Sequence, residues 1–211
     1  RLSAALRIRA AVQPCSSVQR RRRQQLLDAL TDGRGPFGAG MALDVGQHLL
    51  YEKREFSLPS EINLVNLISY LATKHLPRVG ICNKATAENV SLALREAISN
   101  AMFHGNLEIS SDIREKEGLK AFNEMIESRR SDERFTARRV HFSCEITRDY
   151  AEYIIEDEGK GFDHSKLPDP RDPNNFFNKS GRGILIIKIH MDEVEWNAKG
   201  NRIRMRKNKV S

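Results

Sequence analysis

The spacing of hydrophobic and polar residues changes along the chain, and each spacing predicts a different secondary-structure element. Alternating apolar and polar positions are typical of strands with one buried face, whereas apolar positions three and four residues apart are typical of helices. We therefore expect strands at 50–58, 139–147 and 150–156, a hairpin at 194–205, and helices at 60–76, 86–105 and 184–189. This order of elements predicts an α/β two-layer sandwich, in which helices cover one face of a mixed, largely antiparallel sheet.

Capping residues and glycines mark where the two long helices should begin and end. Ser60 follows Pro59 and is the expected N-cap of the first helix, which Pro77 stops. The second helix begins near Thr86 and is expected to end at Gly105, because glycine readily adopts the left-handed conformation that terminates helices.

Residues 107–136 are expected to be a helical insert on the surface of a domain that spans 42–211. Asp112-x-x-Glu115 has the spacing of a capping box at a helix start. A weak apolar stripe follows among many charges, at Leu119, Phe122 and Ile126. A contact with a partner protein is the alternative use of this insert.

Residues 1–41 form a basic segment with no core pattern. Four consecutive arginines, 20–23, precede a glycine-rich stretch at 33–40. We expect a disordered tail or residues upstream of a natural start at Met41. An organelle transit peptide and a tail that binds polyanions are the alternatives that this composition leaves open.

Composition and charge then narrow the class of protein. The chain has 211 residues, of which 30% are charged and 39% hydrophobic, and no apolar run is long enough to cross a bilayer. Its three cysteines are far apart, which favours a reducing compartment, so we expect a cytoplasmic protein. The net charge of +7 comes almost entirely from residues 1–41, so the rest of the chain gives no reason to expect nucleic-acid binding.

The helix expected at 86–105 carries a ridge of polar side chains. Glu96, Asn100 and His104 follow one another at intervals of four, so their polar ends should align along one face. A carboxylate, an amide and an imidazole supply a base, a metal-ligating oxygen and a hydrogen-bond donor. The alternative is the solvated face of an amphipathic helix.

Two glycine-bearing stretches follow further along the chain. Asp157 ends a buried strand, where its carboxylate could accept a hydrogen bond from a ligand's amino group, and Gly159 and Gly161 would let the backbone approach a flat ring. Gly181-Arg182-Gly183 opens a helix, where free N–H groups favour an anion such as phosphate. A simple turn and a glycine-rich loop end are the alternative interpretations. Neither a Walker A loop nor a Rossmann fingerprint is present.

In this order the three stretches resemble the N-box, G1-box and G2-box of the histidine-kinase-like ATPase superfamily, the Bergerat fold. Two strings narrow the resemblance to the anti-sigma-factor serine/threonine kinases of bacterial stress-response and sporulation circuits. These are Glu96-Ala97-Ile98-Ser99-Asn100-Ala101-Met102-Phe103-His104-Gly105 and Ser180-Gly181-Arg182-Gly183-Ile184 with Met191-Asp192-Glu193-Val194-Glu195. The resemblance covers roughly residues 50–207, and the basic tail and the insert fall outside it.

The resemblance implies ATP and Mg²⁺ as cofactors and assigns a role to each matching residue. Asn100 would ligate Mg²⁺, Glu96 would be the general base, and Asp157 would read the adenine amino group. Residues 163–180 would form a lid over ATP. The other implied ATP-binding residues are Gly159 and Gly161 with Phe162 packed behind them, Ser180, Gly181, Arg182 and Gly183 at the phosphates, and His104 as a phosphate-side donor or a cap of the helix end.

The resemblance further implies a kinase that works in a partner-switching circuit. Its substrate would be an anti-sigma-factor antagonist protein, and a sigma factor and a second copy of the chain would be further partners. Three alternatives remain: a nucleotide-gated binding module with little turnover, the catalytic domain of a two-component histidine kinase, and nucleic-acid binding through residues 1–41. The sequence shows no phosphoacceptor histidine in a helical hairpin, which counts against a complete sensor kinase.

Overall fold

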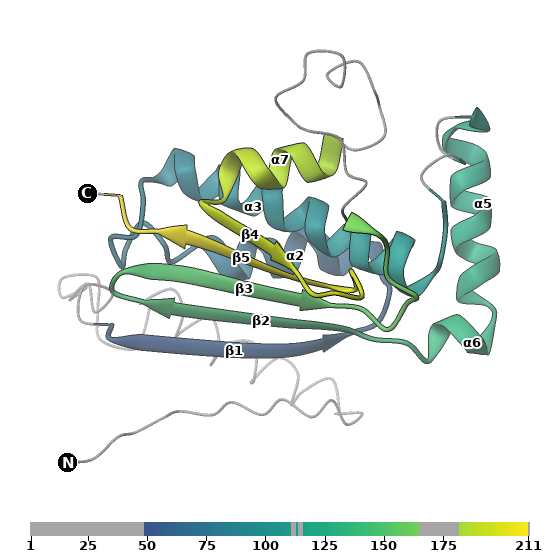
Figure 1. Ribbon diagram of the computed structural model, residues 1–211, viewed down its shortest axis with the longest axis horizontal. Helices are drawn as coiled ribbons and strands as arrows, with labels where there is room; N and C mark the ends of the chain where they lie inside the picture. Colours follow the sequence, from purple (N-terminus) through teal and green to yellow (C-terminus); the bar gives the residue numbers. More distant parts are fainter. Residues whose placement is uncertain (1–48, 111–112, 114–115, 165–181, 211) are drawn as a thin grey trace, which may run out of the picture.

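The computed structural model describes residues 49–110, 113, 116–164 and 182–210, which form a two-layer α/β sandwich (Figure 1). One layer is a five-stranded sheet in which every strand pairs antiparallel to its neighbours. The strand order is β1-β2-β3-β5-β4. The strands are β1 (Tyr51–Leu58), β2 (Val140–Thr147), β3 (Tyr150–Glu156), β4 (Glu193–Trp196) and β5 (Arg202–Asn208).

The other layer consists of helices on one face of this sheet (Figure 1). They are α2 (Ile62–Thr73), α3 (Lys84–Ser99), its continuation η2 (Asn100–Asn106), which is a π-helix, and α7 (Arg182–His190). The insert supplies α5 (Gly118–Arg130) and α6 (Glu133–Thr136), which stand at one end of the sheet. No helix in the described ranges is long and apolar enough to cross a membrane.

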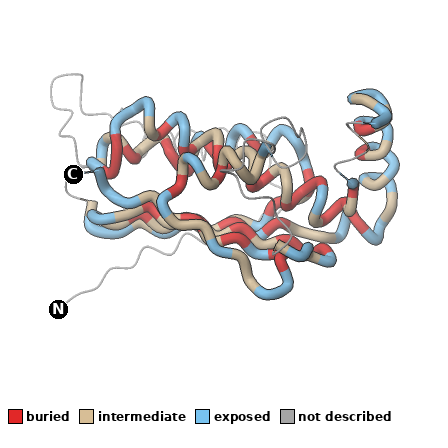
Figure 2. The backbone as a smooth tube through the Cα atoms, turned by 45° about the horizontal axis from the view of Figure 1, so that its top comes forward, coloured by how far each residue is buried: buried red, intermediate tan, exposed pale blue. Residues whose placement is uncertain are grey.

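The core lies between the two layers, where Figure 2 shows the buried residues gathered. Alternate residues of β2 and β3 face the helices, and Phe142 and Tyr153 are almost completely buried there. Tyr153 also donates its hydroxyl to the carbonyl of Ala72 at 3.4 Å, which satisfies the one polar group of this ring inside the core. The predicted two-layer α/β class is therefore confirmed.

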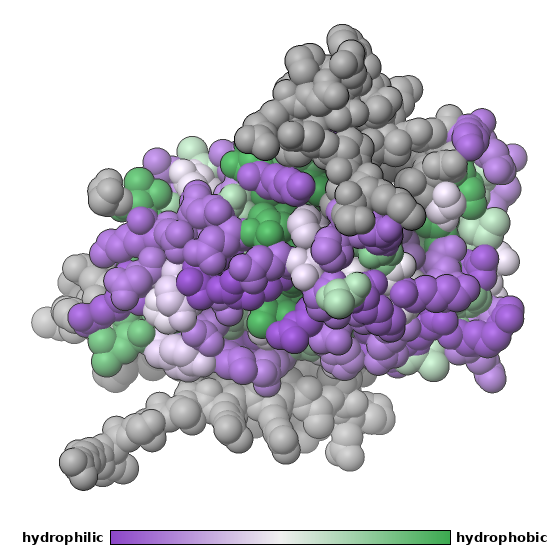
Figure 3. Space-filling model, viewed as in Figure 1, coloured by the Kyte–Doolittle hydropathy of each residue, from purple (hydrophilic) through white to green (hydrophobic). Residues whose placement is uncertain are grey.

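The opposite face of the sheet is polar, and hydrophilic residues cover most of the surface seen in Figure 3. Arg204 and Arg206 of β5 lie between glutamates of β3 and β4. Both guanidinium groups reach the same carboxylate oxygen of Glu152, at 2.7 and 2.8 Å. Burial raises the pKa of Glu152, but the hydrogen bonds from the two arginines outweigh it, so the pKa lies below its usual value.

Glu152→Gln should lower the free energy of unfolding at pH 7 by about 1 to 2 kcal/mol, because neutral glutamine accepts the hydrogen bonds of the two arginines more weakly at this shielded site. The loss should vanish as the pH falls through the lowered pKa of Glu152, since the protonated wild type then resembles the variant. Urea unfolding at pH 7 and pH 3 measures both values. Glu195→Gln, at a more exposed partner of Arg204, is the matched control and should change little.

Three expectations about local structure need correction. Glu61, and not Ser60, is the N-cap of α2, because Ser60 is buried and accepts a hydrogen bond from Asn106. The helix predicted to run to Gly105 is an α-helix only to Ser99 and continues as the π-helix η2. In the insert, Phe122 and Ile126 are buried but Leu119 is exposed.

Several predictions lie outside the described residues. They concern the basic tail at 1–41, the capping box at Asp112 and Glu115, most of the loop at 163–180, and the phosphate-side residues Ser180 and Gly181.

Candidate functional site

Helix α3 holds Glu96 and Asn100 in place through the residues on its other side. Asn83 caps the helix by accepting a hydrogen bond from the backbone N–H of Thr86 at 2.8 Å. Leu94 and Ile98 are completely buried in the core, and burying a side chain of this size contributes about 2 kcal/mol. The helix is therefore fixed against the sheet.

The first turn of α7 lies against Glu96 and Asn100. A Cβ atom placed on Gly183 would be 2.8 Å from Oε2 of Glu96 and 3.6 Å from Nδ2 of Asn100. Only glycine fits so close to the carboxylate without displacing it. The structure thus brings Gly183 next to Glu96 and Asn100, which precede it by more than 80 positions in the sequence. Arg182, on the same turn of α7, is exposed.

The π-helix η2 begins at Asn100 and carries His104. His104 is exposed, and its Nδ1 lies 2.6 Å from the carbonyl oxygen of Ile109, just after the helix. This contact favours the cap of the helix end, one of the two roles expected for His104.

Asp157 lies at the other end of η2, in contact with two glycines. A Cβ atom on Gly105 would be 2.3 Å from the carboxylate carbon of Asp157, and one on Gly159 would be 2.3 Å from the carbonyl oxygen of Gly105. These groups are packed so closely that neither glycine could carry a side chain without displacing the Asp157 carboxylate or the Gly105 backbone.

Burial raises the pKa of the Asp157 carboxyl from 3.8 to about 6, although the Gly159 N–H donates to it at 2.8 Å and lowers the pKa in part. A buried carboxylate beside bare backbone is a strong hydrogen-bond acceptor, because little water competes for it. Asp157 is therefore suited to bind an amino group such as that of adenine.

Two asparagines that the sequence did not single out hold the Asp157 loop in place. Asn201 accepts from the backbone N–H of Asp157 at 2.9 Å through its carbonyl, and its side chain donates to the Asp157 carbonyl at 2.6 Å. Asn106, fully buried, accepts from the N–H of Glu158 at 2.8 Å. Asn106 directly follows the N-box string, and Asn201 lies in the predicted hairpin turn, but neither position signalled this role.

The loop continues through Gly161 into Phe162. Gly161 has φ of +75°, and a Cβ there would lie 2.0 Å from the carbonyl oxygen of Lys199, so this close approach requires glycine. The ring of Phe162 is 41% exposed and packs edge-on against Trp196 and His164, each at 6.4 Å between centroids. Phe162 therefore joins an aromatic cluster next to β4.

The donor groups at the site fit ATP with Mg²⁺. Among the described residues no group of three His, Cys, Asp or Glu side chains could hold a metal ion. Mg²⁺ does not need one, because it usually keeps several waters and takes its remaining ligands from phosphates and one or two protein oxygens. The side-chain oxygen of Asn100 would be such a ligand, and the backbone of Gly183, which carries no side chain, lies next to it.

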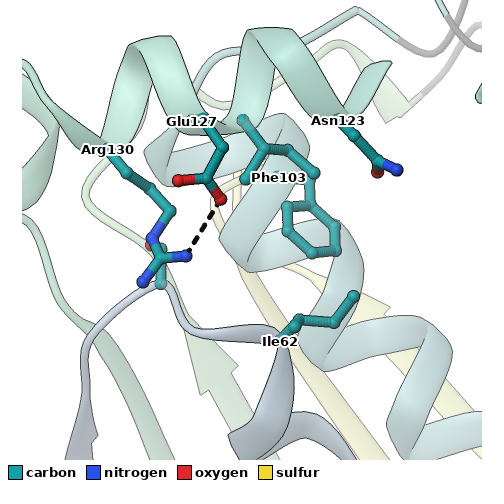
Figure 4. Close-up of a pocket in the computed structure, with 7 residues that line it drawn as sticks. Ile62, Phe103, Asn123, Glu127 and Arg130 are labelled. Carbon is teal, nitrogen blue, oxygen red and sulfur yellow. Dashed lines mark hydrogen bonds and ion pairs between the residues drawn. The ribbon is translucent and has the colours of Figure 1, made fainter. Parts of the chain in front are cut away.

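A separate hollow of about 100 Å³ lies between the insert and the main body (Figure 4). Phe103 of η2 and Ile62 of α2 face it from the body, and Asn123, Glu127 and Arg130 of α5 face it from the insert. Its lining includes neither Glu96, Asn100, Asp157 nor Gly183, and it is too small for a nucleotide.

Comparisons with known proteins agree with this geometry. A family model described as the histidine kinase-like ATPase domain matches residues 58–207, which span all three motif strings. The match includes every described helix and strand of the sandwich except β1, of which it includes only Leu58, and the last residue of β5. A comparison with curated proteins finds no match. Because the family model covers most of the chain, this protein belongs to the histidine kinase-like ATPase domain family.

Proposed function

We propose that this protein is a serine/threonine kinase that uses ATP and Mg²⁺ to phosphorylate an anti-sigma-factor antagonist. The observation that carries the proposal is the position of the Glu96 carboxylate, one helical turn before Asn100 and against Gly183 at the start of α7. A carboxylate at this place can serve phosphoryl transfer as a base, whereas nucleotide binding alone does not need it.

Each residue of the site would contribute to positioning or proton transfer. Asp157 would accept a hydrogen bond from the adenine amino group and fix the base beside Gly105 and Gly159. Asn100 would hold Mg²⁺, which when bound neutralises phosphate charge. Glu96 would accept the proton of the serine or threonine hydroxyl as that oxygen bonds to the γ-phosphorus of ATP, while the bond from this phosphorus to the β,γ-bridging oxygen breaks and ADP leaves.

The test is transfer of labelled phosphate from ATP in the presence of Mg²⁺. The protein is incubated with each candidate antagonist encoded in the same genome, and phosphoserine and phosphothreonine are identified by mass spectrometry. We expect one antagonist to be labelled. ATP-dependent binding of an antagonist without any phosphorylated product would instead assign the chain to the nucleotide-gated binding modules and overturn the kinase proposal.

The remaining parts of the proposal concern partners and location. We expect the protein to be cytoplasmic and to bind a sigma factor when its antagonist is phosphorylated. A second copy of the chain is a further expected partner. Size-exclusion chromatography with light scattering, with and without a sigma factor, measures both associations.

Trp196 should report nucleotide binding through its fluorescence. It is the single tryptophan of the chain. Its ring lies against Phe162, at the end of the Asp157 loop, and against His164, just after it. The centroid of the ring is also 5.8 Å from Nζ of Lys188 on α7. Because ATP would contact both the loop and α7, we expect a saturable change in emission when Mg²⁺-ATP is titrated. Calorimetric saturation with unchanged emission in the same samples would contradict this.

A further inference from the structure

Glu108 has an unusual backbone conformation at the junction between η2 and the insert. Its φ of +50° makes it the one non-glycine residue with positive φ in the described part of the chain. This conformation is unfavourable for a residue with a Cβ, so local contacts must maintain it. One such contact is the hydrogen bond from its N–H to the carbonyl of Gly105 at 3.3 Å.

The side chain of Glu108 joins two segments that are distant in sequence. Oε1 accepts from Nη1 of Arg138 at 2.9 Å, and Oε2 lies 2.9 Å from Nζ of Lys160. Glu108 and Arg138 are largely shielded from solvent, whereas Lys160 is exposed. The pair with Arg138 is therefore screened less by salt than the pair with Lys160.

Arg138 lies just after the insert. The same Nη1 atom donates to the carbonyl of Asn106 at 2.8 Å, and the guanidinium lies 5.1 Å from the ring centroid of Phe135 in α6. The insert also contacts η2 directly, since Phe122 of α5 packs edge-on against Phe103 at 5.8 Å. The insert thus contacts η2 at Phe103, and Arg138, just after the insert, contacts η2 at Asn106.

Lys160 belongs to the Asp157 loop, the segment from Asp157 to Phe162 that we now call the nucleotide loop, and lies between Gly159 and Gly161. In the same loop, the Glu158 carboxylate accepts from the backbone N–H of Arg139 at 3.2 Å. The residues after the insert therefore hold this loop at two points, once directly through Glu158 and once through Glu108. Asp157 is carried on the segment that these contacts position.

From this geometry we infer that Glu108 is a positioning residue, which links the insert to the nucleotide loop by pairing with Arg138 and Lys160 at once. Its carboxylate holds the loop against η2, so that Asp157 and Gly159 keep the geometry that selects adenine. This inference rests on the proposed nucleotide site, and it gives the insert a route by which a change in its position would alter nucleotide affinity.

The test compares Glu108→Gln with Glu124→Gln, a matched change at an exposed glutamate of α5. We expect Glu108→Gln to raise the ATP dissociation constant about fivefold, to reduce the preference for ATP over GTP, and to speed hydrogen exchange at the amides of Glu158 and Gly159. Hydrogen exchange is measured without nucleotide, so it tests the role of Glu108 independently of ATP binding. If the wild-type protein bound no ATP, that result would refute the proposed function but not the role of Glu108.

Lys160→Gln provides a second variant, which removes only the exposed pair and leaves the fold intact. It should raise the ATP dissociation constant about twofold. The double variant with Glu108→Gln should bind ATP no more weakly than Glu108→Gln alone, because both changes break the same ion pair between Glu108 and Lys160. Unchanged amide exchange and an unchanged ATP-to-GTP preference in Glu108→Gln would overturn the inference. Additive effects in the double variant would overturn it as well.

Discussion

Glu96→Gln should lower the rate of phosphoryl transfer by about 10²- to 10⁴-fold, the usual contribution of a general base, while ATP affinity changes little. Glutamine keeps the shape of the side chain beside Gly183 but cannot accept the hydroxyl proton. Single-turnover transfer from labelled ATP to the antagonist gives the rate, and calorimetry in Mg²⁺ gives the affinity.

Asn100→Ala is the comparison that separates metal binding from proton transfer. It removes the side-chain oxygen one turn after Glu96, so ATP affinity in Mg²⁺ should fall by at least about tenfold, with a smaller loss when Mg²⁺ is absent. The two variants together test whether neighbouring side chains on one helix have separate roles. Equal losses of ATP affinity in both variants would refute the division.

Asp157→Asn should change nucleotide binding and stability in opposite directions. ATP affinity should fall by about 10- to 100-fold, because a charged acceptor for the adenine amino group is lost. In the absence of nucleotide, however, the variant should be more stable at pH 7 by about 1 to 3 kcal/mol. Burial raises the pKa of Asp157 to about 6, so the folded protein bears a cost for ionising this carboxyl at neutral pH.

The pH dependence follows from the direction of that shift. The pKa of Asp157 is higher in the folded than in the unfolded protein, so its contribution to stability is present below about pH 4 and is lost as the pH rises through 6. The advantage of Asp157→Asn should therefore be absent at pH 4 and full at pH 7, as measured by urea unfolding.

Asp149→Asn is the control for this experiment. Asp149 is exposed in the turn between β2 and β3 and lies outside the nucleotide site, so neither stability nor ATP affinity should change appreciably. A variant at Asp157 that destabilised the protein without nucleotide at pH 7 would contradict the explanation by burial.

The alternation of residues in β2 allowed this strand and its buried face to be predicted. In β3, Ile154 and Ile155 predicted burial on both faces, whereas the structure buries only alternate residues and leaves Ile154 half-buried. That alternation is a local property, because successive side chains of a strand point to opposite faces wherever the strand lies. The three motif strings of the sequence likewise predicted the family. Helix ends were predicted less well: Ser60 has the chemistry of an N-cap, yet Asn106 engages it instead.

The sequence by itself therefore determined the two-layer sandwich and the identity of Glu96, Asn100 and Asp157 as candidates, because residue type and local spacing suffice for these. Only the tertiary structure decided that the helix continues as a π-helix and that His104 lies against the carbonyl of Ile109. It also decided that Gly105 abuts Asp157 and that Glu108 joins Arg138 to Lys160. These contacts link segments that are distant along the chain, and no local pattern encodes such packing.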